Sequence, residues 1–125
     1  LFPYTTLFRS YGSCDAFLMP SLFEPCGLSQ IMSLRYGTVP IVRETGGLKD
    51  TVEPYNEYEN TGTGFSFSNY DAGELLGAVR YALEVYNRHK AAWEGIVTRG
   101  MSLDFSWRNS ARAYEKLYER LAEEP

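Results

Sequence analysis

The chain has 125 residues, a length that suits one compact domain and is too short for two. It is 44% hydrophobic and 22% charged, as soluble globular proteins are, which argues against a disordered chain. The 12 basic and 16 acidic residues give a formal charge of −4, and the basic residues are scattered, so no nucleic-acid surface is expected.

Neither a membrane span nor a metal site is expected. No apolar run approaches the roughly 20 residues that cross a bilayer, and the first residues show no signal-peptide pattern. Cys14 and Cys26 lack CxxC spacing and have no His or Cys neighbours, which argues against zinc and against a disulfide framework. We therefore expect no cofactor and no metal, and a reducing, cytoplasmic location.

The first part of the chain predicts alternating strands and helices. Residues 1–10, LFPYTTLFRS, fit no period, so we expect a non-native or unstructured leader and a folded part at 11–125. A short apolar run at 16–19 predicts a buried strand. It is followed by a helix at 27–36, a strand at 39–43 and a short helix at 47–52.

The second part of the chain continues the alternation and then becomes helical. After a polar loop at 53–62, the alternating stretch 63–68 predicts a third strand near a sheet edge. Asp71 is a suitable cap for a long amphipathic helix after it. Two more helices are predicted, one from about 88 to 99 that ends at Gly100, and one at about 107–122.

Strands that alternate with helices predict an α/β fold with a parallel sheet. Three strands are few for a doubly wound domain, which usually has about six. We therefore expect the second half of a Rossmann-like domain, with an unpaired edge at the strand 16–19. The apolar stripe of the last helix exceeds what this sheet needs, so Tyr114 and Tyr118 are expected to be exposed.

The stretch FEPCGLSQ, residues 23–30, lies between the first strand and the helix after it. Ligands bind at the carboxyl ends of strands in open α/β sheets, and a helix start directs N–H groups and positive dipole at an anion. Glu24 adds a carboxylate, and Gly27 has no side chain to keep a ligand from the backbone. Such a loop suits a ligand that carries hydroxyls and phosphate, although spacing alone leaves open that Glu24 only caps the helix.

The motif resembles bacterial glycogen synthase and plant starch synthase. The resemblance rests on MPSLFEPCGL, on RYGTVPIVRETGGLKDTV after the helix and on DFSW at 104–107, and it covers about nine tenths of the chain. It implies the C-terminal lobe of a two-domain GT-B glycosyltransferase, with a terminal helix that crosses back to the N-terminal domain. Such an enzyme moves glucose from ADP-glucose to the 4-hydroxyl at the end of an α-1,4-glucan, with retention of configuration.

The resemblance also implies roles for particular residues. Glu24 would bind the hydroxyls of the donor glucose as the catalytic carboxylate. Cys26 would line the sugar pocket, although sequence alone favours a small buried side chain there. Gly27, Leu28 and Ser29 would bind the sugar and the distal phosphate through their N–H groups and stabilise the departing ADP.

Other positions add less. Thr45, Gly46 and Gly47 follow the second strand at the same rim, so a secondary, pocket-shaping role is assigned to them, although a plain turn is a frequent alternative. Related retaining transferases often carry a second Glu where this chain has Met32, and starch and glycogen synthases share its absence. His89 and the acidic residues of the loop 53–62 are expected on the solvated surface, and no P-loop or Ser/His/Asp set is present.

Three functions remain open from the sequence. The first is part of a glucan synthase, inactive alone because the N-terminal domain and its basic pair are not encoded here; it would be cytoplasmic, or plastidic in a plant or alga. The second is a stand-alone α/β module that binds a nucleotide or another anion without catalysis. The third is a structural piece without a ligand, which calorimetry with ADP or ADP-glucose would separate from the other two.

Overall fold

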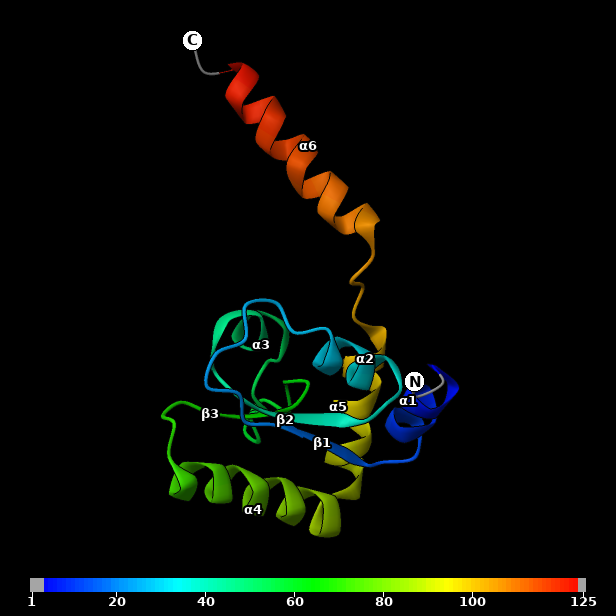
Figure 1. Ribbon diagram of the computed structural model, residues 1–125, viewed down its shortest axis with the longest axis vertical. Coiled ribbons are helices and arrows are strands. Elements are labelled where there is room, and N and C mark those ends of the chain that lie inside the picture. Colours follow the sequence, from blue (N-terminus) through cyan, green and yellow to red (C-terminus); the bar gives the residue numbers. More distant parts are fainter. Residues whose placement is uncertain (1–3, 124–125) are drawn as a thin grey trace.

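A computed structural model describes residues 4–123 and shows a parallel sheet with helices on both faces (Figure 1). This confirms the predicted α/β class. The elements in chain order are α1 (Tyr4–Gly12), β1 (Ala16–Met19), α2 (Ser29–Arg35), β2 (Val39–Arg43), α3 (Gly46–Thr51), β3 (Phe65–Phe67), α4 (Ala72–Arg88), α5 (Lys90–Ser102) and α6 (Trp107–Glu123). Within the described residues the sheet has three strands in the order β1-β2-β3, all parallel.

Strand β2 forms the centre of the sheet, and its residues from Val39 to Val42 are buried. A strand that is covered on both faces needs apolar side chains at successive positions, which explains its unbroken apolar run. On the face of α4 and α5, one cluster joins Val39, Ile41, Phe65, Ala82, Val85, Trp93 and Ile96. On the other face, Val42 packs with Leu48 and Val52 under α3. The two clusters hold the sheet between its helix layers.

Strand β1 has the predicted bounds but is less buried than predicted. It pairs with β2 from Ala16 to Met19, and no second partner strand is found in residues 4–123. Leu18 is 48% exposed beside a surface hollow that Val79 and Leu83 of α4 also line. An apolar edge strand of this kind can pair with another chain.

Several element ends differ from the predicted ones: β3 is Phe65–Phe67 instead of 63–68, and two helix ends differ because of glycines. Helix α2 begins at Ser29 rather than Gly27, because Gly27 has φ +65° and Leu28 occupies the N-cap. Helix α5 continues through Gly100 to Ser102. A Cβ at Gly100 would lie 2.8 Å from Cδ2 of Leu34, so this glycine lets α5 approach α2 instead of ending the helix.

The expectation of an unstructured leader is wrong for the described part of residues 1–10. Helix α1 starts at Tyr4, and Phe8 packs against Tyr36 with 5.9 Å between ring centroids. Tyr11 is buried against Phe17, and Thr38 donates a hydrogen bond to its carbonyl. Two aromatic side chains three residues apart lie on one helix face and provide this packing. Residues 1–3 lie outside the described range, and the non-native origin of 1–10 stays a prediction.

Helix α6 projects away from the rest of the molecule (Figure 1). Tyr114 is 60% exposed and Tyr118 is 65% exposed, which confirms the expectation for both.

At the turn before the helix, the Asp104 carboxylate accepts from the N–H of Ser106 at 2.9 Å. Hydrogen bonds from the side chain and backbone of Ser106 lower the pKa of Asp104. Among the helices of residues 4–123, none has both the length and the apolarity to cross a membrane.

Candidate functional site

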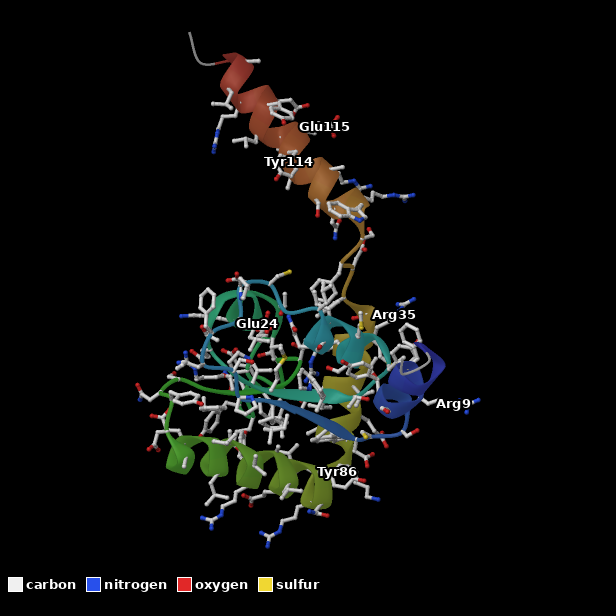
Figure 2. All side chains as sticks on the ribbon, viewed as in Figure 1. Arg9, Glu24, Arg35, Tyr86, Tyr114 and Glu115 are labelled. Atoms are coloured by element: carbon white, nitrogen blue, oxygen red, sulfur yellow. The ribbon has the colours of Figure 1, made fainter. Side chains whose placement is uncertain are left out.

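The loops that follow the three strands lie at one edge of the sheet, because the strands are parallel. Two of these loops contain the residues singled out in the sequence, at 24–29 and at 45–47. Figure 2 shows Glu24 on the side of the sheet where α2 and α3 lie. The candidate site is therefore formed by this rim and the starts of these two short helices.

The loop 24–27 lies directly on the start of α3. The N–H of Gly47 donates to the carbonyl oxygen of Glu24 at 3.1 Å. A Cβ at Gly46 would lie 2.1 Å from that carbonyl oxygen, and a Cβ at Gly47 would lie 1.8 Å from the carbonyl oxygen of Cys26. Only glycine fits such distances. The TGG motif thus accommodates the EPCG loop, and the structure brings the two predicted motifs together.

Glu24 is partly buried and uses one carboxylate oxygen within its own loop. The N–H of Gly27 donates to Oε1 of Glu24 at 3.0 Å, which is the capping contact that the sequence left open. The other oxygen, Oε2, has no hydrogen-bond partner in the described part of the chain. Glu24 therefore closes the loop and still has an acceptor for a ligand hydroxyl.

The start of α2 supplies free backbone donors beside this carboxylate. Leu28 occupies the N-cap without a side-chain hydrogen bond. The N–H groups of Leu28 and Ser29 find no partner among residues 4–123. Cys26 is exposed, so the alternative of a buried small side chain is wrong. A surface cysteine and two free N–H groups are available to a molecule at the rim.

Thr45 precedes α3 as its N-cap residue, but its side chain makes no capping hydrogen bond. Its backbone carbonyl accepts from the N–H of Leu48 at 3.1 Å. The half-buried Thr45 thus joins β2 to α3 and places the two glycines that follow it.

Arg43, which the sequence analysis did not single out, connects the loops after β1 and β3. Its guanidinium donates from Nε to the carbonyl of Ser21 at 3.0 Å and from Nη2 to that of Leu22 at 2.6 Å. Its Nη1 donates to the carbonyl of Ser68 at 3.0 Å, and the group lies 5.8 Å from the ring centroid of Tyr70. The feature of the sequence that could have identified Arg43 is a cation at the end of an apolar strand, just before the TGG turn.

The loop after β3 is closed by a second carboxylate. Glu74 accepts from the side-chain amide of Asn69 and from the N–H groups of Asn69 and Ser68, the latter two at 2.8 and 3.1 Å. These bonds, the side chain of Asn69 first, lower the pKa of Glu74. Asp71 caps α4 by accepting from the N–H groups of Gly73 and Glu74, as predicted.

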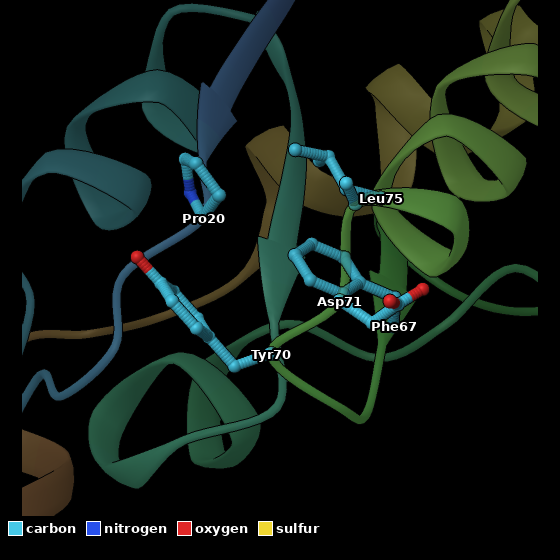
Figure 3. Close-up of a pocket in the computed structure, with 6 residues that line it drawn as sticks. Pro20, Phe67, Tyr70, Asp71 and Leu75 are labelled. Atoms are coloured by element: carbon cyan, nitrogen blue, oxygen red, sulfur yellow. The ribbon is translucent and has the colours of Figure 1, made fainter.

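A hollow of about 260 Å³ lies between these loops and α4 (Figure 3). Mainly apolar side chains line it, among them Pro20, Phe67 and Leu75. None of its lining residues belongs to 24–29 or 45–47. It lies at the same strand ends but carries no free carboxylate, since Asp71 is engaged in the cap.

No cluster of metal-binding side chains accompanies the rim in the described part of the chain. Within residues 4–123, no group of three or more His, Cys, Asp or Glu side chains is arranged to hold a metal. His89, Glu57 and Glu59 are exposed. The polar groups at the rim are thus the carboxylates of Glu24, Glu44 and Glu74, the Arg43 guanidinium and backbone N–H groups. Free acceptors and N–H groups of this kind suit a ligand with hydroxyls and an anionic group.

Comparison with known proteins gives consistent matches. The family described as Glycosyl transferases group 1 matches residues 3–94. The chain is 75% identical over 113 residues to a glycogen synthase of Lachnospira eligens, and 69% identical over 113 residues to one of Lachnoclostridium phytofermentans. In both cases the match covers 90% of this chain and 24% of the relative. The chain thus spans about a quarter of the length of these relatives.

Two solved structures share the fold. One is the catalytic domain of Starch Synthase IV from Arabidopsis thaliana, bound to ADP and acarbose, which is 41% identical in sequence with a TM-score of 0.74. The match covers 85% of this chain and 22% of the starch synthase chain. The other is the sucrose-phosphate synthase of Thermosynechococcus elongatus, which is 28% identical in sequence with a TM-score of 0.62. The match covers 90% of this chain and 26% of the sucrose-phosphate synthase chain.

Proposed function

Because the chain belongs to the family of glycosyl transferases group 1, we propose that it forms part of the donor-binding lobe of a glycogen or starch synthase. The reaction is transfer of glucose from ADP-glucose to the non-reducing end of an α-1,4-glucan, with retention of configuration. The observation that carries the proposal is the 75% identity to a glycogen synthase over a segment whose EPCG loop lies against the TGG start of α3.

Each rim group has a place in this reaction. The free oxygen of Glu24 accepts from hydroxyls of the donor glucose, and its charge favours the positive character that develops on the sugar. The N–H groups of Leu28 and Ser29 bind the distal phosphate, where fixed donors stabilise negative charge on the leaving ADP. Cys26 lines the sugar pocket, while Gly27 and the Thr45-Gly46-Gly47 turn let the ligand and the loop approach the backbone.

The chemistry then follows from these positions. The bond between C1 of glucose and the phosphate oxygen breaks, and the electron pair leaves with ADP. The acceptor 4-hydroxyl oxygen attacks C1 on the same face, and its proton passes to the departing phosphate oxygen. The structure of Starch Synthase IV bound to ADP and acarbose supports ADP as the nucleotide.

The partners and the location belong to the same proposal. The chain spans about a quarter of the length of its relatives. The acceptor glucan would therefore be bound by the second lobe, the N-terminal domain of the same enzyme. We expect the 125 residues alone to bind the donor without turning it over. The enzyme would act in the cytoplasm, or in the plastid of a plant or alga, with ADP-glucose as its small-molecule donor.

Two measurements test the proposal. Calorimetry on the chain compares ADP-glucose, UDP-glucose and inorganic diphosphate; we expect ADP-glucose to bind most tightly. Equal binding of all three would instead indicate a non-catalytic anion module. A chimera, in which this chain replaces the segment that it matches in the Lachnospira eligens enzyme, should incorporate labelled glucose into glucan, and a folded but inactive chimera would contradict the proposal.

A further inference from the structure

Gln30, the second residue of α2, is a long polar side chain with an exposed fraction of 0%. Its Nε2 donates to Oγ1 of Thr51 at 3.0 Å and to the carbonyl oxygen of Cys26 at 3.3 Å. The Thr51 hydroxyl in turn donates to the carbonyl oxygen of Gly47 at 2.5 Å. Because the hydroxyl hydrogen is used on Gly47, Oγ1 of Thr51 is an acceptor, which assigns the nitrogen of the amide to this side.

These hydrogen bonds form a buried polar connection between three segments. Gln30 belongs to α2, Cys26 belongs to the EPCG loop, and Thr51 with Gly47 belongs to α3. The loop and α3 meet through glycines, so few side chains pack between them. The amide of Gln30 is therefore the main side-chain link that holds the loop on α3.

The other end of the amide is not paired. Oε1 of Gln30 is buried and has no hydrogen-bond partner within the described residues. It lies under Gly27, 2.4 Å from the position that a Cβ would take there. A buried acceptor without a partner destabilises a fold, and an apolar side chain of the same shape avoids that cost. Packing alone therefore does not explain a glutamine at this position.

We propose that Gln30 is a positioning residue, which with Thr51 fixes the loop 24–27 on α3 so that Glu24 and the N–H groups at the start of α2 face one ligand. This inference rests on the proposed function, because the fixed geometry of the rim matters for a donor that carries a sugar and a phosphate. Displacement of reacting groups by about 1 Å can reduce a rate about 100-fold, so such a link matters for catalysis more than for folding.

The first test measures the loop in the 125-residue chain itself. In Gln30→Met, an apolar side chain of similar length replaces the amide. We expect hydrogen exchange at the N–H groups of Gly27 and Gly47 to become about tenfold faster, while the melting temperature does not fall. Ser33→Ala is the control, because Ser33 is equally buried on α2 but its hydroxyl donates to the carbonyl of Gln30 and not to the loop.

Variants at the other end of the link test the hydrogen bond itself. Thr51→Ser keeps a hydroxyl and should leave the exchange of both glycines near that of the unsubstituted chain, whereas Thr51→Val should accelerate it as Gln30→Met does. Unchanged exchange in Gln30→Met and Thr51→Val would overturn the inference. Equal acceleration at every amide of the chain, which shows general destabilisation, would also overturn it.

The second test measures catalysis in the chimera described above. We expect kcat to fall at least tenfold in Gln30→Met, at unchanged melting temperature, and to fall likewise in Thr51→Val. Thr51→Ser keeps the hydroxyl and should retain kcat. An active chimera whose kcat does not respond to Gln30→Met would overturn the inference and leave the proposed function intact. An inactive unsubstituted chimera would contradict the proposed function, and the exchange measurement would still decide whether Gln30 fixes the loop.

Discussion

Replacing Glu24 by Gln separates the two roles that this side chain can have. The side chain keeps its shape, and its amide oxygen can still accept from the N–H of Gly27, now 3.0 Å from Oε1. The capping contact therefore persists in weakened form. What is lost is the negative charge beside the place where we put the donor sugar.

The two roles predict effects of different size. Hydrogen bonds to a charged acceptor contribute about 1 kcal/mol more than those to a neutral one, and the partial exposure of Glu24 reduces this difference. The melting temperature should therefore fall by no more than about 5 °C. Loss of a charge that stabilises the transition state lowers kcat about 100-fold, roughly 3 kcal/mol.

The assay follows glucose incorporation and thermal unfolding on the same preparation of the chimera. Glu44→Gln is a matched control, because the Glu44 carboxylate lies at the same rim but accepts from the hydroxyls of Ser66 and Ser68, at 2.7 and 3.4 Å. We expect Glu44→Gln to keep kcat within about threefold. A near-normal kcat for Glu24→Gln, with a loss of stability, would show that Glu24 only caps the loop.

Three further predictions concern the fold around the site. In a denaturant titration, Gly47→Ala should lower the free energy of unfolding by more than about 1 kcal/mol, because the new Cβ would lie 1.8 Å from the carbonyl oxygen of Cys26. The control is Gly77→Ala in α4, where a Cβ meets nothing within 4 Å. This substitution should raise the free energy of unfolding by about 0.5–1 kcal/mol. Sedimentation should show self-association of the chain, weakened in Leu18→Lys, and a sharp monomer boundary for the unsubstituted chain would contradict the edge argument. The pKa of Glu74 is lower in the folded chain than its unfolded value of about 4.5, so the Glu74 carboxylate stabilises the fold above that value, and this stabilisation is lost as the pH falls through the folded pKa. Glu74→Gln should therefore remove part of the fall of the melting temperature in acid. An unchanged pH profile of the melting temperature in this variant would contradict the role of Glu74.

The sequence predicts the sheet well, because each strand signal is local. The strands β1 and β2 have the predicted bounds, since each contains an apolar run of four residues, which Arg43 follows in β2. The cap at Asp71 is equally local, because its carboxylate reaches N–H groups two and three residues along the chain. Glu24 and the TGG motif lie at one rim for a similar reason: parallel strands end on the same side.

Features that depend on distant contacts were not predictable in this way. Helix α1 is held by aromatic contacts of Phe8 and Tyr11 with residues 28 and 6 positions further along the chain, Tyr36 and Phe17. Gly100 has the sequence context of a helix end, but its neighbour Leu34 makes it a packing position. The exposure of Cys26 follows from the conformation of its loop, and the pattern of apolar residues in the sequence does not predict loop conformations.

The contacts at the rim also bear on how a ligand would bind there. The loop 24–27 is held by hydrogen bonds within the chain, because Glu24 accepts from Gly27 through one oxygen and its carbonyl accepts from Gly47. A sugar that uses the second oxygen of Glu24, and a phosphate that uses the free N–H groups of Leu28 and Ser29, need not break either bond. Little ordering of the loop then remains to be done on binding, which lowers its entropic cost. The glycines of α3 and the amide of Gln30 are what make this preformed arrangement possible, since the first permit the close approach of the loop and the second holds it in place.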